Sequence, residues 1–290
     1  MDPRPARTMR AAAAACLALV CLTLAATAAG AQTTLERIRE EGEVRVGVAN
    51  ERPYGYVTAD GELTGEAPEI ARRVFAAIDP AIGMEPVVLP FGRLIDALRA
   101  GDIDVIAAGM FVTPERCELI AFSEPTYRIG QAFAVAAGNP DGLTDYRALA
   151  ANPEARIGLL AGAVEHNYAY VAGVEAGQVE MYPDVEEALA GLKGGEVDAI
   201  GLTSLSIRNL VDGEEGFEAT AQFYPEVDGE RVVGYGAFGF RQEDEDLREA
   251  FNAELAGFVG SEAHLEAVAP FGFTAEMVPE RSVEELCGGE

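Results

Sequence analysis

Basic and metal-binding residues are scarce in this sequence. Its 290 residues include 21 Lys and Arg against 49 Asp and Glu, with only two His, four Cys and no Trp. The formal net charge of -28 would repel nucleic acid and anionic membrane surfaces, so we expect neither as a partner. No metal-ligand spacing occurs, and we expect neither a metal nor a cofactor.

Long hydrophobic runs are missing beyond the N-terminus. Residues 1–31 contain three Arg, an apolar run from Ala11 to Ala28 and the ending Ala29-Gly30-Ala31, a pattern typical of a secretory signal peptide. We expect cleavage before Gln32, with a retained membrane anchor or a lipoprotein at Cys21 or Cys16 as alternatives. The mature chain is therefore expected in the periplasm or another extracytoplasmic compartment.

Signal-peptide cleavage leaves only two cysteines, Cys117 and Cys287. In an oxidising compartment the two could form one disulfide, which would tie the C-terminus to the first half of the chain. Two unpaired thiols are the alternative. No C-x-x-C spacing is present, so a redox function is not expected.

Strand and helix patterns alternate along the mature chain, which favours βαβ units with mostly parallel sheets. The expected strands are 43–48, 85–89, 104–108, 156–160 and 197–202, and the expected helices are 34–41, 66–77, 94–100, 185–192 and 244–259. The class is therefore α/β.

A repeated unit indicates two similar lobes. Leu94–Asp104 resembles Ala188–Asp198, since each has a helix, a glycine stop, an acidic residue, a β-branched residue and an Asp entering a strand. Because β segments lie between and after the repeats, we expect two crossovers. The ligand is then expected in the cleft between the lobes.

The expected domain boundaries follow from those crossovers. Residues 1–31 form the signal peptide, and residues 32–135 form the first part of lobe 1. Lobe 2 spans 136–233, and residues 234–290 return to lobe 1 with the C-terminal helices.

Arg116 is the leading candidate for a ligand-binding residue. It closes the stretch from Gly109 to Arg116 that follows a buried strand, where a guanidinium can bind a carboxylate through two hydrogen bonds. Thr113 lies at the expected N-cap of the next helix and would add donors to the same anion. The alternative is a surface Arg paired with Glu115 or Glu118.

Aromatic residues gather in loops after strands, notably Tyr54, Phe91 and Phe111. Aromatic faces attract cations, and Glu51 would supply the matching anion. With Arg116 these residues describe a site for a zwitterion. The alternative is that the aromatics belong to the core and that Glu51 is a solvated loop carboxylate.

The sequence contains few patterns that are typical of a catalytic site. Of the two histidines, only His166 has suggestive neighbours, among them Glu165. The glycines of Gly234–Gly239 have dinucleotide spacing, but no helix start follows them, so a hinge strand explains them better. We expect a protein that is not an enzyme, with a periplasmic lyase built on Glu165 and His166 as the remote alternative.

Taken in order, several segments resemble the polar amino-acid family of periplasmic binding proteins, across essentially the whole mature chain. They are Val46–Glu66, Leu94–Asp104, Thr113–Arg116, Phe122–Tyr127 and Val197–Ala199. The resemblance implies a two-lobed periplasmic binding protein fold of type II with a two-stranded hinge, which closes around its ligand. It also implies a monomer that delivers a solute to an ABC transporter permease.

One departure from the family pattern bears on the ligand. The family usually has an Asp for the α-ammonium group where this chain has Thr203. The sequence is instead similar to the ectoine- and hydroxyectoine-binding branch. The matching segments are Asn50–Tyr56, Gly65–Glu69, Ala107–Phe111, Arg116–Glu118, Gly234–Phe240 and Glu285–Cys287.

That branch implies a role for each site residue. Glu51 would meet the ring amidinium, an aromatic box would enclose the ring, Arg116 would hold the carboxylate, and a lobe 2 loop would supply backbone donors. The expected ligand-binding set is Glu51, Tyr54, Phe91, Gly109, Phe111, Thr113, Arg116, Gly162, Ala163, Val164 and Thr203.

The expected function is import of the compatible solute ectoine or hydroxyectoine. The dispersed acidic residues fit this function, because an acidic surface keeps a protein soluble in brine. A polar amino acid, proline or glycine betaine is the alternative ligand. The sensor domain of a receptor is a further alternative, which we disfavour because no second apolar run of membrane-spanning length is present.

Overall fold

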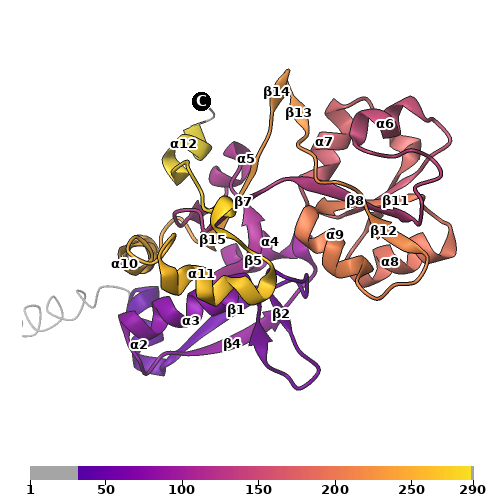
Figure 1. The fold of residues 1–290 in the computed structure, drawn as a ribbon. Helices are drawn as coiled ribbons and strands as arrows, with labels where there is room; N and C mark the ends of the chain where they lie inside the picture. The colour runs from indigo at the N-terminus through magenta and orange to yellow at the C-terminus, as the bar shows by residue number, and fades with distance from the viewer. Residues whose placement is uncertain (1–31, 289–290) are drawn as a thin grey trace, which may run out of the picture.

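The computed structural model describes residues 32–288, which form two α/β lobes lying side by side (Figure 1). The expected signal peptide lies outside these described residues. Within them, no helix is both long and apolar enough to cross a membrane.

Lobe 1 is built on a six-stranded sheet of order β4-β1-β5-β15-β6, with β7 also beside β15. Its strands are β1 (Glu43–Val48), β4 (Gly83–Val88), β5 (Val105–Phe111), β6 (Ala121–Phe122), β7 (Tyr127–Ile129) and β15 (Gly234–Phe240), with the small hairpin β2 (Tyr56–Val57) and β3 (Leu63–Thr64). Its helices are α2 (Thr34–Glu41), α3 (Glu66–Ile78), α4 (Leu94–Ala100), α5 (Pro114–Cys117), α10 (Glu245–Leu255), α11 (Glu262–Val268) and α12 (Val283–Gly288).

Lobe 2 is built on a five-stranded sheet of order β10-β9-β11-β8-β12. Its strands are β8 (Gln131–Ala136), β9 (Ile157–Leu160), β10 (Val179–Tyr182), β11 (Ala199–Thr203) and β12 (Phe217–Ala219), and a projecting hairpin joins β13 (Glu226–Val227) to β14 (Glu230–Arg231) (Figure 1). Its helices are α6 (Tyr146–Ala151), α7 (Glu165–Val171), α8 (Val185–Gly194) and α9 (Ser204–Val211).

Both sheets are mixed, which corrects the expectation of mostly parallel sheets. Strands β4, β1 and β5 are parallel in lobe 1, as are β10, β9 and β11 in lobe 2. The crossover strands β15 and β8 run antiparallel to these neighbours, because each enters its sheet from the other lobe. All of β8 pairs in the lobe 2 sheet, so the first passage lies at Gly130, before the expected boundary at 135.

The sequence repeat is confirmed as a structural repeat. Helices α4 and α8 each end at a left-handed glycine, Gly101 with φ 78° and Gly195 with φ 71°. In both lobes, the carboxylate of the Asp that follows accepts a backbone hydrogen bond from the segment of the neighbouring parallel strand. The backbone N–H of Arg45 donates to Asp104 at 3.0 Å, and that of Arg156 donates to Asp198 at 2.8 Å.

Asp104 also anchors the end of lobe 1 remote from the crossovers. Arg37, Arg45 and Arg241 approach its carboxylate at 2.6, 2.7 and 3.3 Å. Burial would raise the pKa of Asp104, but the hydrogen bonds from Arg45 and Arg37 outweigh burial and hold the pKa below its usual range. This buried network joins β1, β5, α2 and the end of β15 into one body.

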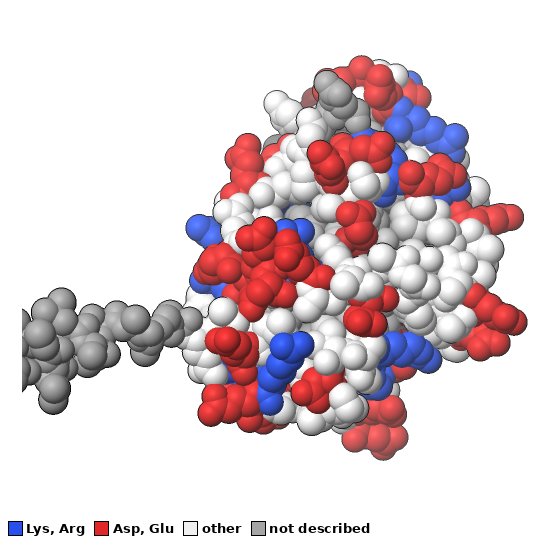
Figure 2. Space-filling view, turned by 90° about the vertical axis from the view of Figure 1, so that its left-hand side faces the viewer, with Lys and Arg blue, Asp and Glu red and all other residues white. Residues whose placement is uncertain are grey.

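The surface is acidic. Figure 2 shows acidic side chains spread over the face that carries α2 and α10, with few basic side chains between them. Such a surface disfavours anionic partners and promotes solubility through self-repulsion.

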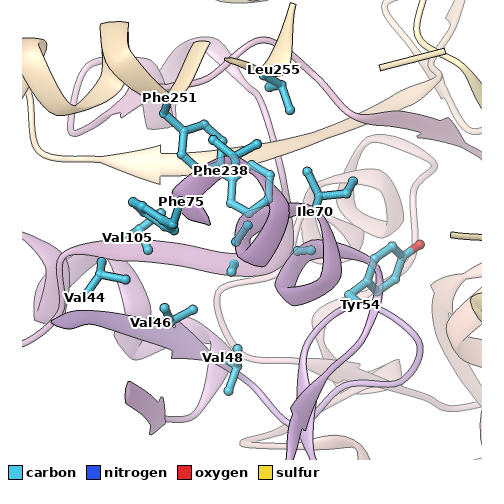
Figure 3. Packing of buried hydrophobic residues seen from close by; sticks show 14 of the residues in the cluster. Val44, Val46, Val48, Tyr54, Ile70, Phe75, Val105, Phe238, Phe251 and Leu255 are labelled. Carbon is cyan, nitrogen blue, oxygen red and sulfur yellow. The ribbon is translucent and has the colours of Figure 1, made fainter. Parts of the chain in front are cut away.

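Lobe 1 has two hydrophobic clusters, and one of them lies on the α3 side of its sheet. Phe75, Phe238 and Phe251 come from α3, β15 and α10 and pack together, with ring centroids 5.4 and 4.7 Å from Phe251 (Figure 3). Tyr54 lies at the margin of this cluster, with its hydroxyl pointing away from the phenylalanines (Figure 3). The core therefore holds one face of Tyr54 and leaves its polar end for the cleft.

Helix α10 ends at Leu255, short of the expected end at residue 259. Gly257 and Gly260 follow, and glycine destabilises a helix interior.

Cys117 and Cys287 form a disulfide with Cα atoms 5.8 Å apart, which ties α12 to α5. The two cysteines are separated by 170 residues. A bond that closes so long a loop restricts the unfolded chain strongly, because loop-closure entropy grows with loop length.

We predict that replacing both Cys117 and Cys287 by Ser lowers the free energy of unfolding by about 2–4 kcal/mol. Chemical denaturation of the oxidised parent and the double variant measures this difference. An unchanged denaturation midpoint, or two titratable thiols in the exported parent, would contradict the prediction.

Candidate ligand-binding site

A pocket lies between the lobes. Its lining residues are Glu51, Tyr54, Phe91, Ala108, Gly109, Phe111, Arg116, Ala163, Val164, Glu165, Leu202 and Thr203. The structure therefore brings together, from both lobes, all of the expected site residues except Thr113 and Gly162.

The loop that carries Glu51 and Tyr54 is fixed against the lobe 1 sheet. A Cβ atom on Gly55 would lie 2.2 Å from the carbonyl oxygen of Ala107 in β5, so only glycine allows this approach. The loop closes on itself through the N–H of Tyr54, which donates to the carbonyl oxygen of Glu51 at 2.9 Å. Both side chains are thereby held at the pocket.

The aromatic wall continues into the core. Tyr54 stacks on Tyr127 at 5.1 Å, and Phe273 meets both rings edge-on. Gly109, with φ 65°, lies against these rings, and its carbonyl oxygen accepts the Tyr127 hydroxyl at 2.7 Å. Tyr127 and Phe273 support the site without lining it, and sequence reasoning did not assign them this role.

Arg116 is buried at the pocket, with 8% of its surface exposed. Its Nη1 donates to the carbonyl oxygen of Phe111 at 2.8 Å, and its Nη2 donates to that of Gly162, in lobe 2, at 2.9 Å. The guanidinium lies 5.5 Å from the Phe91 ring centroid. Burial lowers the pKa of Arg116, but a guanidinium keeps its charge and has further N–H groups for a carboxylate.

The structure gives Thr113 and Gly162 other roles than direct lining of the pocket. Thr113 caps α5, since its Oγ1 accepts the N–H of Arg116 at 3.3 Å. The carbonyl oxygen of Gly162 accepts a hydrogen bond from Nη2 of Arg116. Thr113 therefore fixes the backbone of Arg116, and Gly162 holds its guanidinium.

Lobe 2 contributes two hydroxyl groups that reach across the cleft. The Tyr54 hydroxyl donates to Oγ1 of Thr203 at 2.9 Å, and Ser206 Oγ donates to Oε1 of Glu51 at 2.5 Å. Thr203 also caps α9, which places Ser206 one helical turn further on. Ser206 was missed by sequence reasoning, although its position three residues after the expected site residue Thr203 gives the signal.

Glu51 is buried, and no Lys or Arg of residues 32–288 forms an ion pair with it. Burial raises its pKa to about 7, against a lowering by the Ser206 hydrogen bond and a further rise from the charge of Glu165. A cation in the pocket would favour the ionised form of Glu51 and lower this pKa.

Glu165, at the start of α7, is a second buried carboxyl that lines the pocket, and burial raises its pKa to about 7. Its neighbour His166 is exposed to solvent. The two side chains therefore lie in different environments and do not form an acid–base pair in the cleft.

Closure of the lobes brings two glycines into contact. A Cβ atom on Gly162 would lie 2.5 Å from Cα of Gly92, and one on Gly92 would lie 2.8 Å from the carbonyl oxygen of Ala161. Any side chain at either position would hold the lobes apart.

We predict that Gly162→Ala weakens ligand binding while the protein stays folded. Overpacking at the lobe contact costs about 1–3 kcal/mol in the closed form, which corresponds to roughly 5- to 150-fold weaker binding. Gly173→Ala is the matched control, because Gly173 also has a positive φ, 88°, but has no atom within 4 Å of its Cβ position. Isothermal titration calorimetry compares the two, and equal affinities would contradict the role of the Gly92–Gly162 contact.

These features define a class of protein, in which two α/β lobes close around a small molecule in a buried pocket. Within that class, the chain belongs to the bacterial extracellular solute-binding proteins, family 3, whose model matches residues 44–265.

Two individual relatives are similar to this chain over most of its length. The chain is 31% identical over 279 residues to a probable amino-acid ABC transporter periplasmic-binding protein of Sinorhizobium fredii, covering 93% of this chain and 91% of that protein. It is 27% identical over 212 residues to the histidine-binding periplasmic protein of Salmonella typhimurium, covering 70% and 77% of the two chains.

Among solved structures, the crystal structure of EhuB in complex with hydroxyectoine matches with a TM-score of 0.80 and 36% identity, covering 89% of this chain and 98% of that chain. The protein is thus a solute-binding component of an ABC importer for amino-acid-like ligands.

Proposed function

We propose that this protein binds ectoine or hydroxyectoine outside the cytoplasm and, as a monomer, delivers it to the permease of an ABC importer without catalysing a reaction. The observation that carries the ligand proposal is the presence of Glu51 and Arg116 in one pocket walled by Tyr54, Phe91 and Phe111. A carboxylate suits the buried guanidinium, and a ring cation suits Glu51 together with the aromatic faces.

The pocket favours a delocalised cation over a primary ammonium group. Thr203, at the end of β11, presents a hydroxyl that already accepts from Tyr54, where the family usually has an Asp for the α-ammonium. The amidinium charge of ectoine is spread over a ring, which aromatic faces stabilise without a second directed carboxylate. The 36% identity to EhuB, solved with hydroxyectoine, supports the same ligand class.

The second candidate ligand is a polar amino acid, proline or glycine betaine in the same role. The aromatic wall also suits a quaternary ammonium, and relatives named as histidine-binding proteins support an amino acid. A lyase has less support, because His166 is exposed while Glu165 faces the pocket.

A thermal-shift screen of the mature protein tests the ligand proposal. A ligand that binds only the folded state raises the melting temperature by mass action, by an amount equivalent to about 2.7 kcal/mol at 100 times its Kd. We expect this shift with ectoine and hydroxyectoine and not with glycine betaine, proline or the common amino acids. A shift confined to amino acids would overturn the ectoine proposal and leave the importer class intact.

We predict that Arg116→Ala weakens binding of the solute by about 2–5 kcal/mol, or roughly 30- to 3,000-fold. The loss arises because the ligand carboxylate then has no buried cation to bind. Arg99→Ala is the control, since Arg99 is exposed on α4, and its affinity should match the parent in calorimetry. Parent-like binding by Arg116→Ala would show that the carboxylate lies elsewhere.

A further inference from the structure

Glu165 and Glu51 line the same pocket from opposite lobes, and among the described residues Arg116 is the only cation that lines it. If both carboxyls are ionised, the protein contributes a net charge of -1 to the pocket, which matches a ligand with a net positive charge. If Glu165 is neutral, the lining is neutral overall and matches a zwitterion. The protonation state of Glu165 therefore decides which ligand charge the pocket accepts.

Burial destabilises the negative charge of Glu165 more than its surroundings stabilise it, because its own backbone N–H, Arg116 and Gln131 lower its pKa but burial raises it by more. The groups that face it are Tyr168 on its own helix, Tyr146 on α6, Gln131 on β8, and Arg116 and Glu51 from lobe 1. Arg116 forms no ion pair with it among the described residues, because the two assigned Arg116 donors serve the carbonyl oxygens of Phe111 and Gly162.

Two buried polar atoms beside Glu165 add to this environment. Within the described chain, Oε1 of Gln131 and the hydroxyl of Tyr146 have no hydrogen-bond partner. The Gln131 amide can serve either state of Glu165, since its NH₂ donates to a carboxylate and its oxygen accepts from a carboxylic acid. Gln131 therefore does not require an ionised Glu165.

A ligand carboxylate bound at Arg116 would place a second anion beside Glu165. Two carboxylates that lie close together in a buried site repel each other, and protonation of one of them relieves the repulsion. The protein carboxyl takes the proton, because the ligand carboxylate keeps the direct hydrogen bonds of Arg116.

We propose that Glu165 acts as a neutral acid in the liganded protein, so that closure over a zwitterion draws one proton from solvent onto its carboxylate. Neutral Glu165 is a specificity-determining residue that admits net-neutral solutes and disfavours cationic ones. The proposal rests on the carboxylate end of the proposed ligand and not on ectoine itself.

The sign of proton exchange follows from the two carboxyls. Both have a pKa near 7 in this closed form, raised by burial. At pH 8 Glu51 is already ionised, so the uptake at Glu165 dominates. At pH 6 Glu165 is already protonated, and a cation beside Glu51 displaces a proton. We therefore expect net proton uptake at pH 8 and net release at pH 6.

The test is calorimetry with ectoine in buffers of different ionisation enthalpy, at pH 6 and pH 8, on the parent and on Glu165→Gln. The parent should take up close to one proton at pH 8, and its affinity should fall by up to about tenfold per pH unit above that. Glu165→Gln should lose the uptake and this fall in affinity, because an amide carries no carboxyl that can take up a proton.

Glu186→Gln is the matched control, since Glu186 is an exposed carboxyl on α8 of the same lobe, and it should behave as the parent. Absence of uptake by the parent at pH 8 would overturn the proposal without any variant. So would tighter binding of L-arginine than of ectoine that is lost in Glu165→Gln, because Glu165 would then bind a ligand cation as an anion.

The ligand assignment and this proposal fail separately. If ectoine does not bind but glycine betaine, L-proline or L-histidine does, the proposed function fails, and the same proton measurement with that ligand decides the role of Glu165. If no carboxylate ligand binds, the proposal falls together with the role of Arg116.

Discussion

The burial of charged groups without a direct ion pair to the protein is the constraint on which the rest of this structure depends. Glu51, Glu165 and Arg116 lie in the closed cleft, and the described residues supply hydroxyls and carbonyl oxygens to them but no ion pair. Removing an unpaired charge from water is costly unless a partner arrives. A molecule that carries both charges offsets that cost at both ends of the pocket, so closure and recognition are the same event.

Closure also depends on two rigid lobes and a contact that only small residues permit. Asp104 binds several elements together at the end of lobe 1 that is remote from the crossovers. Asp198 makes one of the same contacts in lobe 2, a hydrogen bond from the backbone N–H of an Arg. The lobes meet where Gly92 faces Gly162, and the chain passes between the sheets at Gly130. Because the two lobes are closely packed and the Gly92–Gly162 contact has no side chains, a small change at Gly162 destabilises the whole closed form.

Periodicity and spacing predicted most of the fold and much of the pocket. The repeat placed α4 and α8 with their glycine ends, and the resemblance gathered the lining residues from Glu51 to Thr203. Local patterns could not show that β8 and β15 run antiparallel, because strand direction depends on which lobe the chain comes from. Nor could they separate lining residues from supporting ones: Thr113 caps α5, and Ser206 reaches the pocket only across a cleft that forms when distant segments meet.

The acidic surface and the acidic pocket obey different electrostatics. The charge of -28 is spread mainly over exposed side chains, where salt screens it within about 8 Å at physiological ionic strength and over a shorter distance in brine. Buried groups such as Glu51 and Glu165 are screened far less. An acidic exterior can therefore favour solubility at high salt while the charge balance of the pocket stays the same. Selectivity must then arise from the few buried groups themselves, which is why the protonation state of one carboxyl can decide which solutes the pocket admits.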